Sequence, residues 1–179
     1  MSDGQLFPEL FEVEAQDQPA DKDECPLSRS TALFGVFGEQ MVTCDLLEQK
    51  MLVANIIVDV GVDLLISNSP EASDWKRLQV KTCQTAKIQQ VGGATATYTY
   101  SLAPGGNHLS KKRVGGGVMA TEQKRKVDAY AFVGADIKGI HYVTTKELLK
   151  TGSSFRISPQ KMQATQGASR NHMIKELFG

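Results

Sequence analysis

The sequence predicts a single α/β domain in which a central mixed β-sheet is flanked by helices. Three observations support this fold class. A stretch with helical periodicity precedes a series of short segments rich in Val, Ile and aromatic residues. Shorter helical stretches are interspersed among those segments, as expected for a sheet covered by helices. A chain of 179 residues is also long enough for one domain that buries roughly two-thirds of its unfolded surface.

The first predicted element is a helix. Apolar residues recur at three- and four-residue steps from Ser30 to about Lys50, and Ser30 is a suitable N-cap. The next segment predicts two successive strands with a break at Asp59 and Gly61, and two late strands are expected to pair across the turn at Lys138-Gly139. Strands are expected within 52–66, 75–84, 95–100, 127–133 and 140–143, and short helical stretches at 146–150 and 173–178.

Charge is distributed unevenly along the chain. Residues 1–27 carry eight acids and one base, whereas residues 28–179 carry 19 bases and 12 acids, although the formal net charge is zero. We expect an acidic, flexible leader over 1–27 and one folded domain over 28–179, with its core at about 30–150. A basic body favours a phosphate backbone as partner, and an uneven solvated surface explains the same counts equally well.

Several classes of protein are disfavoured by the composition. No apolar run approaches the roughly 20 residues that cross a bilayer, and the first residues lack the pattern of a signal peptide, so no membrane partner is expected. Three cysteines far apart argue against a disulfide framework and for a reducing cytoplasm. The histidines are isolated from one another and from the cysteines, which disfavours a zinc cluster. These residues are Cys25, Cys44, Cys83, His108, His141 and His172.

Polar side chains lie on two neighbouring predicted strands. Because side chains alternate between the faces of a strand, Asp63 and Leu65 share one face of their strand, opposite Val62, Leu64 and Ile66. Gln79 and Lys81 share one face of the next predicted strand. If the two strands pair, Asp63, Gln79 and Lys81 gather at one edge of the sheet. Glu39, beside the apolar stripe of the first helix, would be costly to bury unless it is paired or binds a cation. Alternatively, Glu39 only borders the stripe and reaches water.

Two carboxylates, an amide oxygen and a peptide carbonyl are the hard ligands that suit Mg²⁺ or Mn²⁺. Asp63 is expected to be the main metal ligand, Glu39 an outer or second-metal carboxylate, and Gln79 and the Val80 carbonyl the remaining ligands. Such a metal acidifies its bound water, and Lys81 would orient that water and offset charge on a phosphate. The set predicts phosphodiester hydrolysis. The alternative is an ordinary hairpin with polar surface residues, because a short D…QxK pattern often arises by chance.

Four elements follow one another in order: Glu39, segment 61–65 with Asp63, segment 78–82 with Gln79 and Lys81, and strand 127–133. Over about 30–150 they resemble the PD-(D/E)XK nuclease superfamily, in particular its intron-encoded homing endonucleases and archaeal-type Holliday junction resolvases. The resemblance implies a restriction-endonuclease-like core, Mg²⁺-dependent cleavage of DNA by these four residues, and a homo-dimer or higher homo-oligomer. Gln79 replaces the usual acid, as in some homing and restriction-type members.

A basic passage surrounds three consecutive glycines and is a candidate for contact with DNA. A plain solvated loop explains it nearly as well. The strand at 95–100 is a second candidate, because sequence-specific cleavage needs side chains that read base edges. The six bases are Lys111, Lys112, Arg113, Lys124, Arg125 and Lys126.

The first hypothesis is therefore a metal-dependent, homing-type endonuclease that acts on duplex DNA. The alternatives are a Holliday junction resolvase that acts on branched DNA, and a catalytically silent DNA-binding protein with the same fold. Two further acids are alternatives to these ligands. Asp59 ranks below Asp63, and Asp128, at the start of a strand, is expected to make a structural hydrogen bond.

Overall fold

The structure is a computed structural model that describes residues 26–56, 61–71, 73–88, 95–102, 124, 126–149 and 151–179. Its helices are α1 (Pro26–Glu48), α3 (Thr145–Leu148) and α4 (Pro159–Phe178). Its strands are β1 (Leu52–Asn55), β2 (Leu64–Ser67), β3 (Lys76–Cys83), β4 (Lys87–Ile88), β5 (Ala96–Ser101), β6 (Ala129–Gly134), β7 (Gly139–Thr144) and β8 (Ser154–Ile157).

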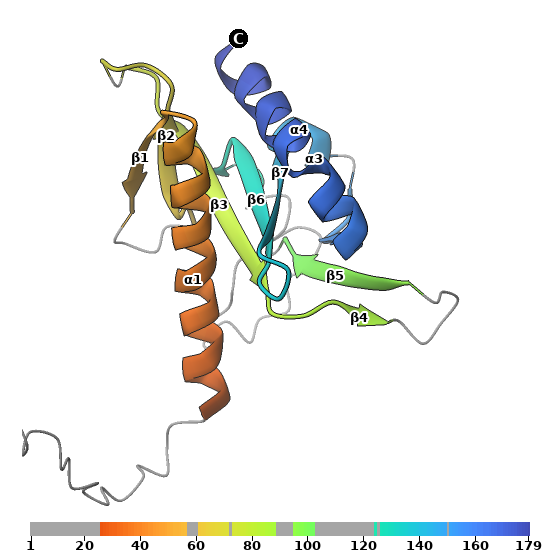
Figure 1. Ribbon diagram of the computed structural model, residues 1–179. Helices are drawn as coiled ribbons and strands as arrows, with labels where there is room; N and C mark the ends of the chain where they lie inside the picture. Colours follow the sequence, from red (N-terminus) through yellow and green to blue (C-terminus); the bar gives the residue numbers. More distant parts are fainter. Residues whose placement is uncertain are drawn as a thin grey trace, which may run out of the picture.

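Five of the strands form a central sheet in the order β1-β2-β3-β6-β7 (Figure 1). The β3 and β6 strands are parallel, and the other neighbouring pairs are antiparallel. A second sheet has the order β4-β5-β8. The predicted α/β class with a central mixed sheet flanked by helices is therefore confirmed, as are the pairing of β2 with β3 and of β6 with β7.

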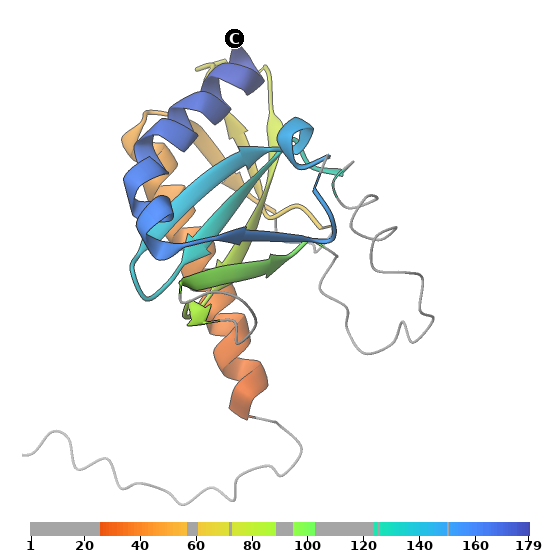
Figure 2. The same ribbon diagram turned by 90° about the vertical axis from the view of Figure 1, so that its right-hand side faces the viewer.

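Two apolar cores lie on opposite faces of the central sheet. On one face, Val42 and Leu46 of α1 and Met173 of α4 pack against Leu78 and Val80 of β3 and their neighbours. On the other face, the second sheet lies over β6 (Figure 2), and its residues pack against the aromatic side chains of that strand. The helices and the second sheet therefore sandwich β3 and β6, and the alternating residues of β3 face two different environments.

Helix α1 is seated on β3 through Gly38. A Cβ atom at this position would lie 1.9 Å from Oγ1 of Thr82, far closer than any real contact, so only glycine allows this approach. Further along α1, the buried Asp45 accepts hydrogen bonds from the Tyr142 hydroxyl (2.8 Å) and from the Arg170 guanidinium (2.6 Å). Asp45 therefore connects α1 to β7 and α4.

The ends of the chain differ from expectation in three ways. Helix α1 begins at Pro26, a residue that suits a first helical turn, and not at Ser30. The β8 strand was not foreseen. The expected short helix at 173–178 is the end of a 20-residue helix, of which only Met162 and Met173 are buried, so the apolar periodicity is weak. In the described part of the chain, no helix is long and apolar enough to cross a membrane.

Candidate active site

Asp63 lies immediately before β2, at the point where β2 and β3 separate. Its amide donates a hydrogen bond to the Leu78 carbonyl (3.1 Å), and its carbonyl accepts one from the Ile56 amide (3.1 Å). The ladder between β2 and β3 begins at the next residue, Leu64, which is paired with Leu78. The backbone of Asp63 is thus fixed by the strands on both sides of it.

Beyond the end of the ladder, the Asp63 carboxylate accepts the hydrogen bond that the Val80 amide would otherwise donate to a backbone carbonyl of the neighbouring strand. Its Oδ2 accepts a hydrogen bond from the Val80 amide (2.7 Å), and both carboxylate oxygens accept from Nε2 of Gln79 (3.1 and 3.3 Å). A strand residue directs its N–H and C=O toward the same neighbour. The Val80 carbonyl therefore leaves β3 from the edge at which Asp63 lies.

Glu39 lies next to Gly38 on α1 and is half-buried. Burial raises the pKa of the Glu39 carboxyl, and the negative charge of Asp63 raises it further. The second effect means that the two carboxylates are within electrostatic reach of each other. The close seating of Gly38 on β3 holds the helix acid near the strand acid.

Tyr130 is a component of this region that the sequence did not reveal. It is the β6 partner of Gln79, its side chain is fully buried, and burial together with the charge of Asp63 raises the pKa of its hydroxyl to about 12. Among the described residues, no partner hydrogen-bonds to this hydroxyl. The alternation of Tyr130 and Phe132 in the strand at 127–133 was the available signal, but the register with Gln79 required the structure.

Lys81 is half-buried on β3, two residues beyond Gln79. Residues two apart in a strand share a face and are about 7 Å apart along it. Lys81 and Gln79 therefore lie on the same face, as the sequence predicted. The structure brings Asp63 and Gln79 into contact, with Glu39 within electrostatic reach of Asp63, and Lys81 lies two residues beyond Gln79 along β3.

The donor groups fit a hard cation. Across the described ranges, no three His, Cys, Asp or Glu side chains form a group that could hold a metal. The groups in contact are the Asp63 carboxylate, the Gln79 amide and the carbonyl edge of Val80, and the Glu39 carboxylate lies within electrostatic reach; all of them can offer oxygen to Mg²⁺ or Mn²⁺. The mutual repulsion of Glu39 and Asp63 is a feature that a bound cation would relieve.

Lys124 of the predicted basic passage is buried, whereas the sequence predicted an exposed side chain. This side chain is only 2% exposed, and its ammonium donates hydrogen bonds to the carbonyls of Leu148, Thr151 and Gly152 at 2.7–3.0 Å. Lys124 thus caps the end of α3, and the prediction that it contacts DNA is wrong. Lys126 is exposed. Lys111, Lys112, Arg113, Arg125 and the alternative ligand Asp59 lie outside the described residues.

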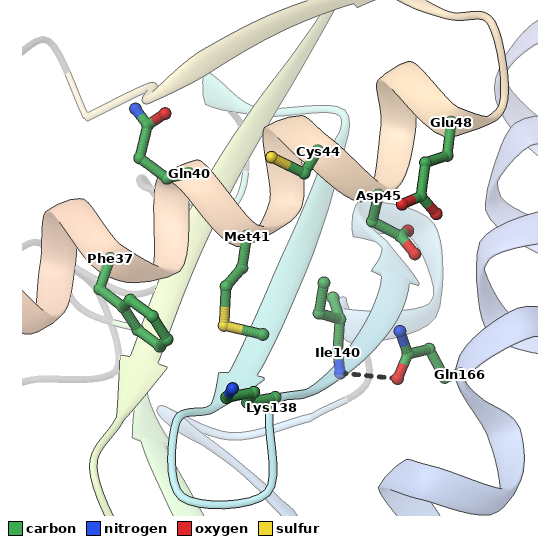
Figure 3. Close-up of a pocket in the computed structure, with 9 residues that line it drawn as sticks. All are labelled: Phe37, Gln40, Met41, Cys44, Asp45, Glu48, Lys138, Ile140 and Gln166. Atoms are coloured by element: carbon green, nitrogen blue, oxygen red, sulfur yellow. Dashed lines mark hydrogen bonds between the residues drawn. The ribbon is translucent and has the colours of Figure 1, made fainter.

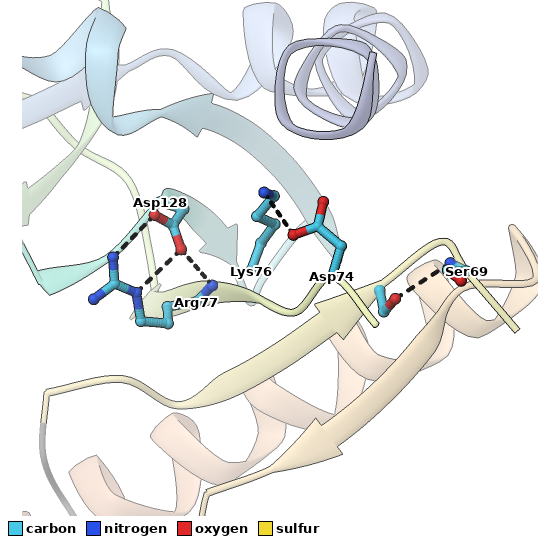
Figure 4. A network of polar contacts seen from close by, with 6 residues as sticks. Ser69, Asp74, Lys76, Arg77 and Asp128 are labelled. Atoms are coloured by element: carbon cyan, nitrogen blue, oxygen red, sulfur yellow. Dashed lines mark hydrogen bonds and ion pairs between the residues drawn. The ribbon is translucent and has the colours of Figure 1, made fainter. Parts of the chain in front are cut away.

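Asp128 has the structural role that its position predicted (Figure 4). Its carboxylate accepts hydrogen bonds from the Arg77 amide (2.7 Å) and from the Arg77 guanidinium (3.1 Å). Burial opposes ionisation of Asp128, but the bonds from Arg77 outweigh it and lower the pKa of the carboxyl. This pair joins the start of β3 to the start of β6, beside the strand positions that carry Gln79 and Tyr130.

A separate groove lies on the helical side of the sheet, between α1, the β6–β7 turn and α4 (Figure 3). Phe37, Met41 and Ile140 supply its apolar lining, and Asp45 and Gln166 its polar end. Gln79 and Lys81 alternate with Val80 on β3 and therefore face away from this side. None of the predicted site residues lines the groove.

Comparison with solved structures shows a likeness in three dimensions. The solved structure of a bacterial homing endonuclease, I-Ssp6803I, is similar with a TM-score of 0.49 and 13% sequence identity, over 82% of this chain and 96% of that one. No protein-family model and no curated protein matches the chain. At 13% identity, residue roles are not transferable between the two chains.

Proposed function

We propose that this protein is a metal-dependent endonuclease that hydrolyses phosphodiester bonds of DNA. The observation that carries the proposal is the Asp63 carboxylate, which is held by the Val80 amide and Gln79 at the point where β2 and β3 diverge, with Glu39 close by. Further support comes from the oxygen-rich donor set and from Lys81 on the same strand face as Gln79.

Each side chain has a distinct proposed role. Asp63, Glu39, the amide oxygen of Gln79 and the Val80 carbonyl would hold Mg²⁺ or Mn²⁺. The bound metal supplies an acidified water and a positive charge next to a phosphoryl oxygen. Lys81 orients the attacking water and offsets the negative charge that develops on the phosphate. The Val80 amide keeps the Asp63 carboxylate fixed before any ligand arrives, so little reorganisation is required during reaction.

The proposal is tested with Asp63→Asn and Lys81→Met, assayed with linear duplex, single-stranded and four-way-junction DNA, in Mg²⁺ and in chelator. We expect cleavage in Mg²⁺ by the wild type only, and near-normal DNA binding by both variants. Lys175→Met on α4 and Asp74→Asn, both exposed, are the matched controls. Cleavage at the wild-type rate by both site variants would refute the proposed site, and DNA binding without any cleavage by the wild type would identify a silent binding protein.

Metal binding is tested without reference to catalysis. We expect Mg²⁺ to raise the unfolding temperature of the wild type, because it binds the native state and relieves the repulsion between Glu39 and Asp63. The Asp63→Asn variant should show a much smaller rise. An equal rise in both proteins would place the cation elsewhere.

Preference among the DNA substrates separates the two enzymatic forms of the proposal. We favour a homing-type enzyme that cleaves linear duplex at preferred sequences, whereas a resolvase would cleave four-way junctions with little regard to sequence. We also propose a homo-dimer, because a duplex presents two equivalent strands. Sedimentation analysis of the free protein and of its DNA complex would show whether one or two copies are bound.

A further inference from the structure

The second sheet has one buried face and one outward face. Tyr98, Tyr100 and Ile157 point inward and are buried in the core beneath it, so the tyrosines of the predicted DNA-contacting strand are not available to a ligand. Directly opposed residues of antiparallel strands share a face. The register therefore places the following residues together on the outward face: Lys87, Thr97, Thr99, Ser101, Ser154 and Arg156.

The outward face is basic and rich in hydroxyl groups. Its six side chains are two bases, two threonines and two serines, without an acid. The surrounding sequence has the same character, because residues 75–121 contain seven Lys or Arg and no Asp or Glu. An ordinary solvated sheet face carries both signs of charge, whereas a face that meets a polyanion does not. Arg, Lys, Ser and Thr are also side chains that contact base edges in the major groove.

The second sheet lies beside the candidate active site. Lys81 is in register with Phe132 of β6, and the ring of Phe132 lies 4.9 Å, centroid to centroid, from the ring of Tyr100 on β5. The second sheet therefore rests against the face of the central sheet that carries Gln79 and Lys81 (Figure 2). Cys83, two residues beyond Lys81 on β3, lines one pocket with Thr97 and Thr99 of the outward face. A duplex with one phosphate at Lys81 would therefore run beside that face.

The spacing of the face matches that of a duplex. Alternate residues of a strand are about 6.8 Å apart, and base pairs rise by about 3.4 Å, so a strand laid along a groove presents one side chain to every second base pair. The major groove admits a β-ribbon. Thr97, Thr99 and Ser101 form such a row on β5, with Lys87 and Arg156 on the strands at either side.

We propose that the outward face of β4, β5 and β8 enters the major groove of duplex DNA and reads base edges next to the phosphate that is cleaved. The inference rests on the proposed endonuclease function. Lys87 and Arg156 supply contacts to phosphates or guanine edges, and the threonine row contacts bases directly. The face thus determines where along a duplex the site at Asp63 acts.

Binding experiments in chelator test this face independently of cleavage. For a random-sequence duplex, we expect the double variant Lys87→Ala/Arg156→Ala to bind more weakly and to lower the slope of log K against log salt by about 2, roughly 0.9 for each phosphate that is no longer neutralised. Lys175→Ala, an exposed base on α4, should leave the slope unchanged. An unchanged slope for a double variant that keeps the wild-type unfolding temperature would overturn the proposal.

Selection from a pool of randomised duplexes tests base reading. We expect the wild type to enrich a preferred sequence, and Thr97→Val/Thr99→Val to lose preference at two or more positions while its salt slope stays the same. Gln163→Ala, exposed on α4, is the control. Absence of any enriched sequence would mean contact with phosphates alone and would refute base reading. Loss of cleavage in Asp63→Asn is measured separately, so failure of this inference leaves the proposed chemistry intact.

Discussion

The close contact of α1 with β3 at Gly38 predicts that Gly38→Ala destabilises the wild type but stabilises a Thr82→Ala variant. Gly38→Ala gains about 1 kcal/mol of helix propensity. The new Cβ atom would lie 1.9 Å from Oγ1 of Thr82, so the helix or the threonine must move by at least about 1 Å. Such overpacking costs about 1–3 kcal/mol. The single variant should therefore be destabilised, by up to about 2 kcal/mol.

Removal of the Thr82 side chain should turn this loss into a gain. Thr82→Ala alone should leave the free energy of unfolding nearly unchanged. The packing lost with the methyl group is offset by removal of a buried hydroxyl that has no described hydrogen-bond partner. In that background Gly38→Ala should stabilise the protein by up to about 1 kcal/mol. Urea unfolding followed by circular dichroism measures all four proteins. Additive effects, within about 0.5 kcal/mol, would show that α1 is not seated on Thr82.

Three other predictions concern charged residues. Glu39→Gln should raise the unfolding temperature in metal-free buffer at pH 7 but not at pH 4, because a carboxyl whose pKa is raised by folding costs stability as pH rises through that pKa. Glu48→Gln, at the exposed end of α1, should show no such difference. Asp45→Ala should cost about 3–5 kcal/mol in urea unfolding, because it leaves a buried guanidinium unpaired. Lys124→Met should lower the free energy of unfolding by about 1–3 kcal/mol, because three carbonyls lose their hydrogen-bond donor, and should leave the salt dependence of DNA binding unchanged. Lys126→Met should reduce the salt dependence of DNA binding and leave the free energy of unfolding unchanged.

The central strands were predictable because they alternate strongly. In β3 the apolar Leu78 and Val80 alternate with polar residues, so the common face of Gln79 and Lys81 followed from the sequence alone. Helix α4 was largely missed for the opposite reason. It buries few apolar residues, and its clearest signal was local, namely Ser158 as N-cap followed by Pro159. Tertiary packing of Met162 and Met173, not periodicity, fixes its extent.

The candidate site was predictable in its residue types but not in its contacts. Strand alternation indicated that Asp63 and Gln79 would converge. It did not indicate that the Val80 amide would hold the carboxylate or that Tyr130 would be the β6 partner of Gln79, because both depend on register. Lys124 was misassigned because a cluster of bases appears uniform in sequence. Burial against the end of α3 separates it from the exposed Lys126.

The bond between Asp45 and Arg170 spans 125 residues of chain and has a consequence for folding. Until the last helix has docked, a half-formed molecule carries a carboxylate in its interior without the cation that compensates it. Contacts between such distant segments form late, since the long intervening loop must first be closed. Helix α1, which carries Glu39, would therefore reach its final position only when α4 has docked, so removal of α4 would leave the candidate site without an ordered Glu39.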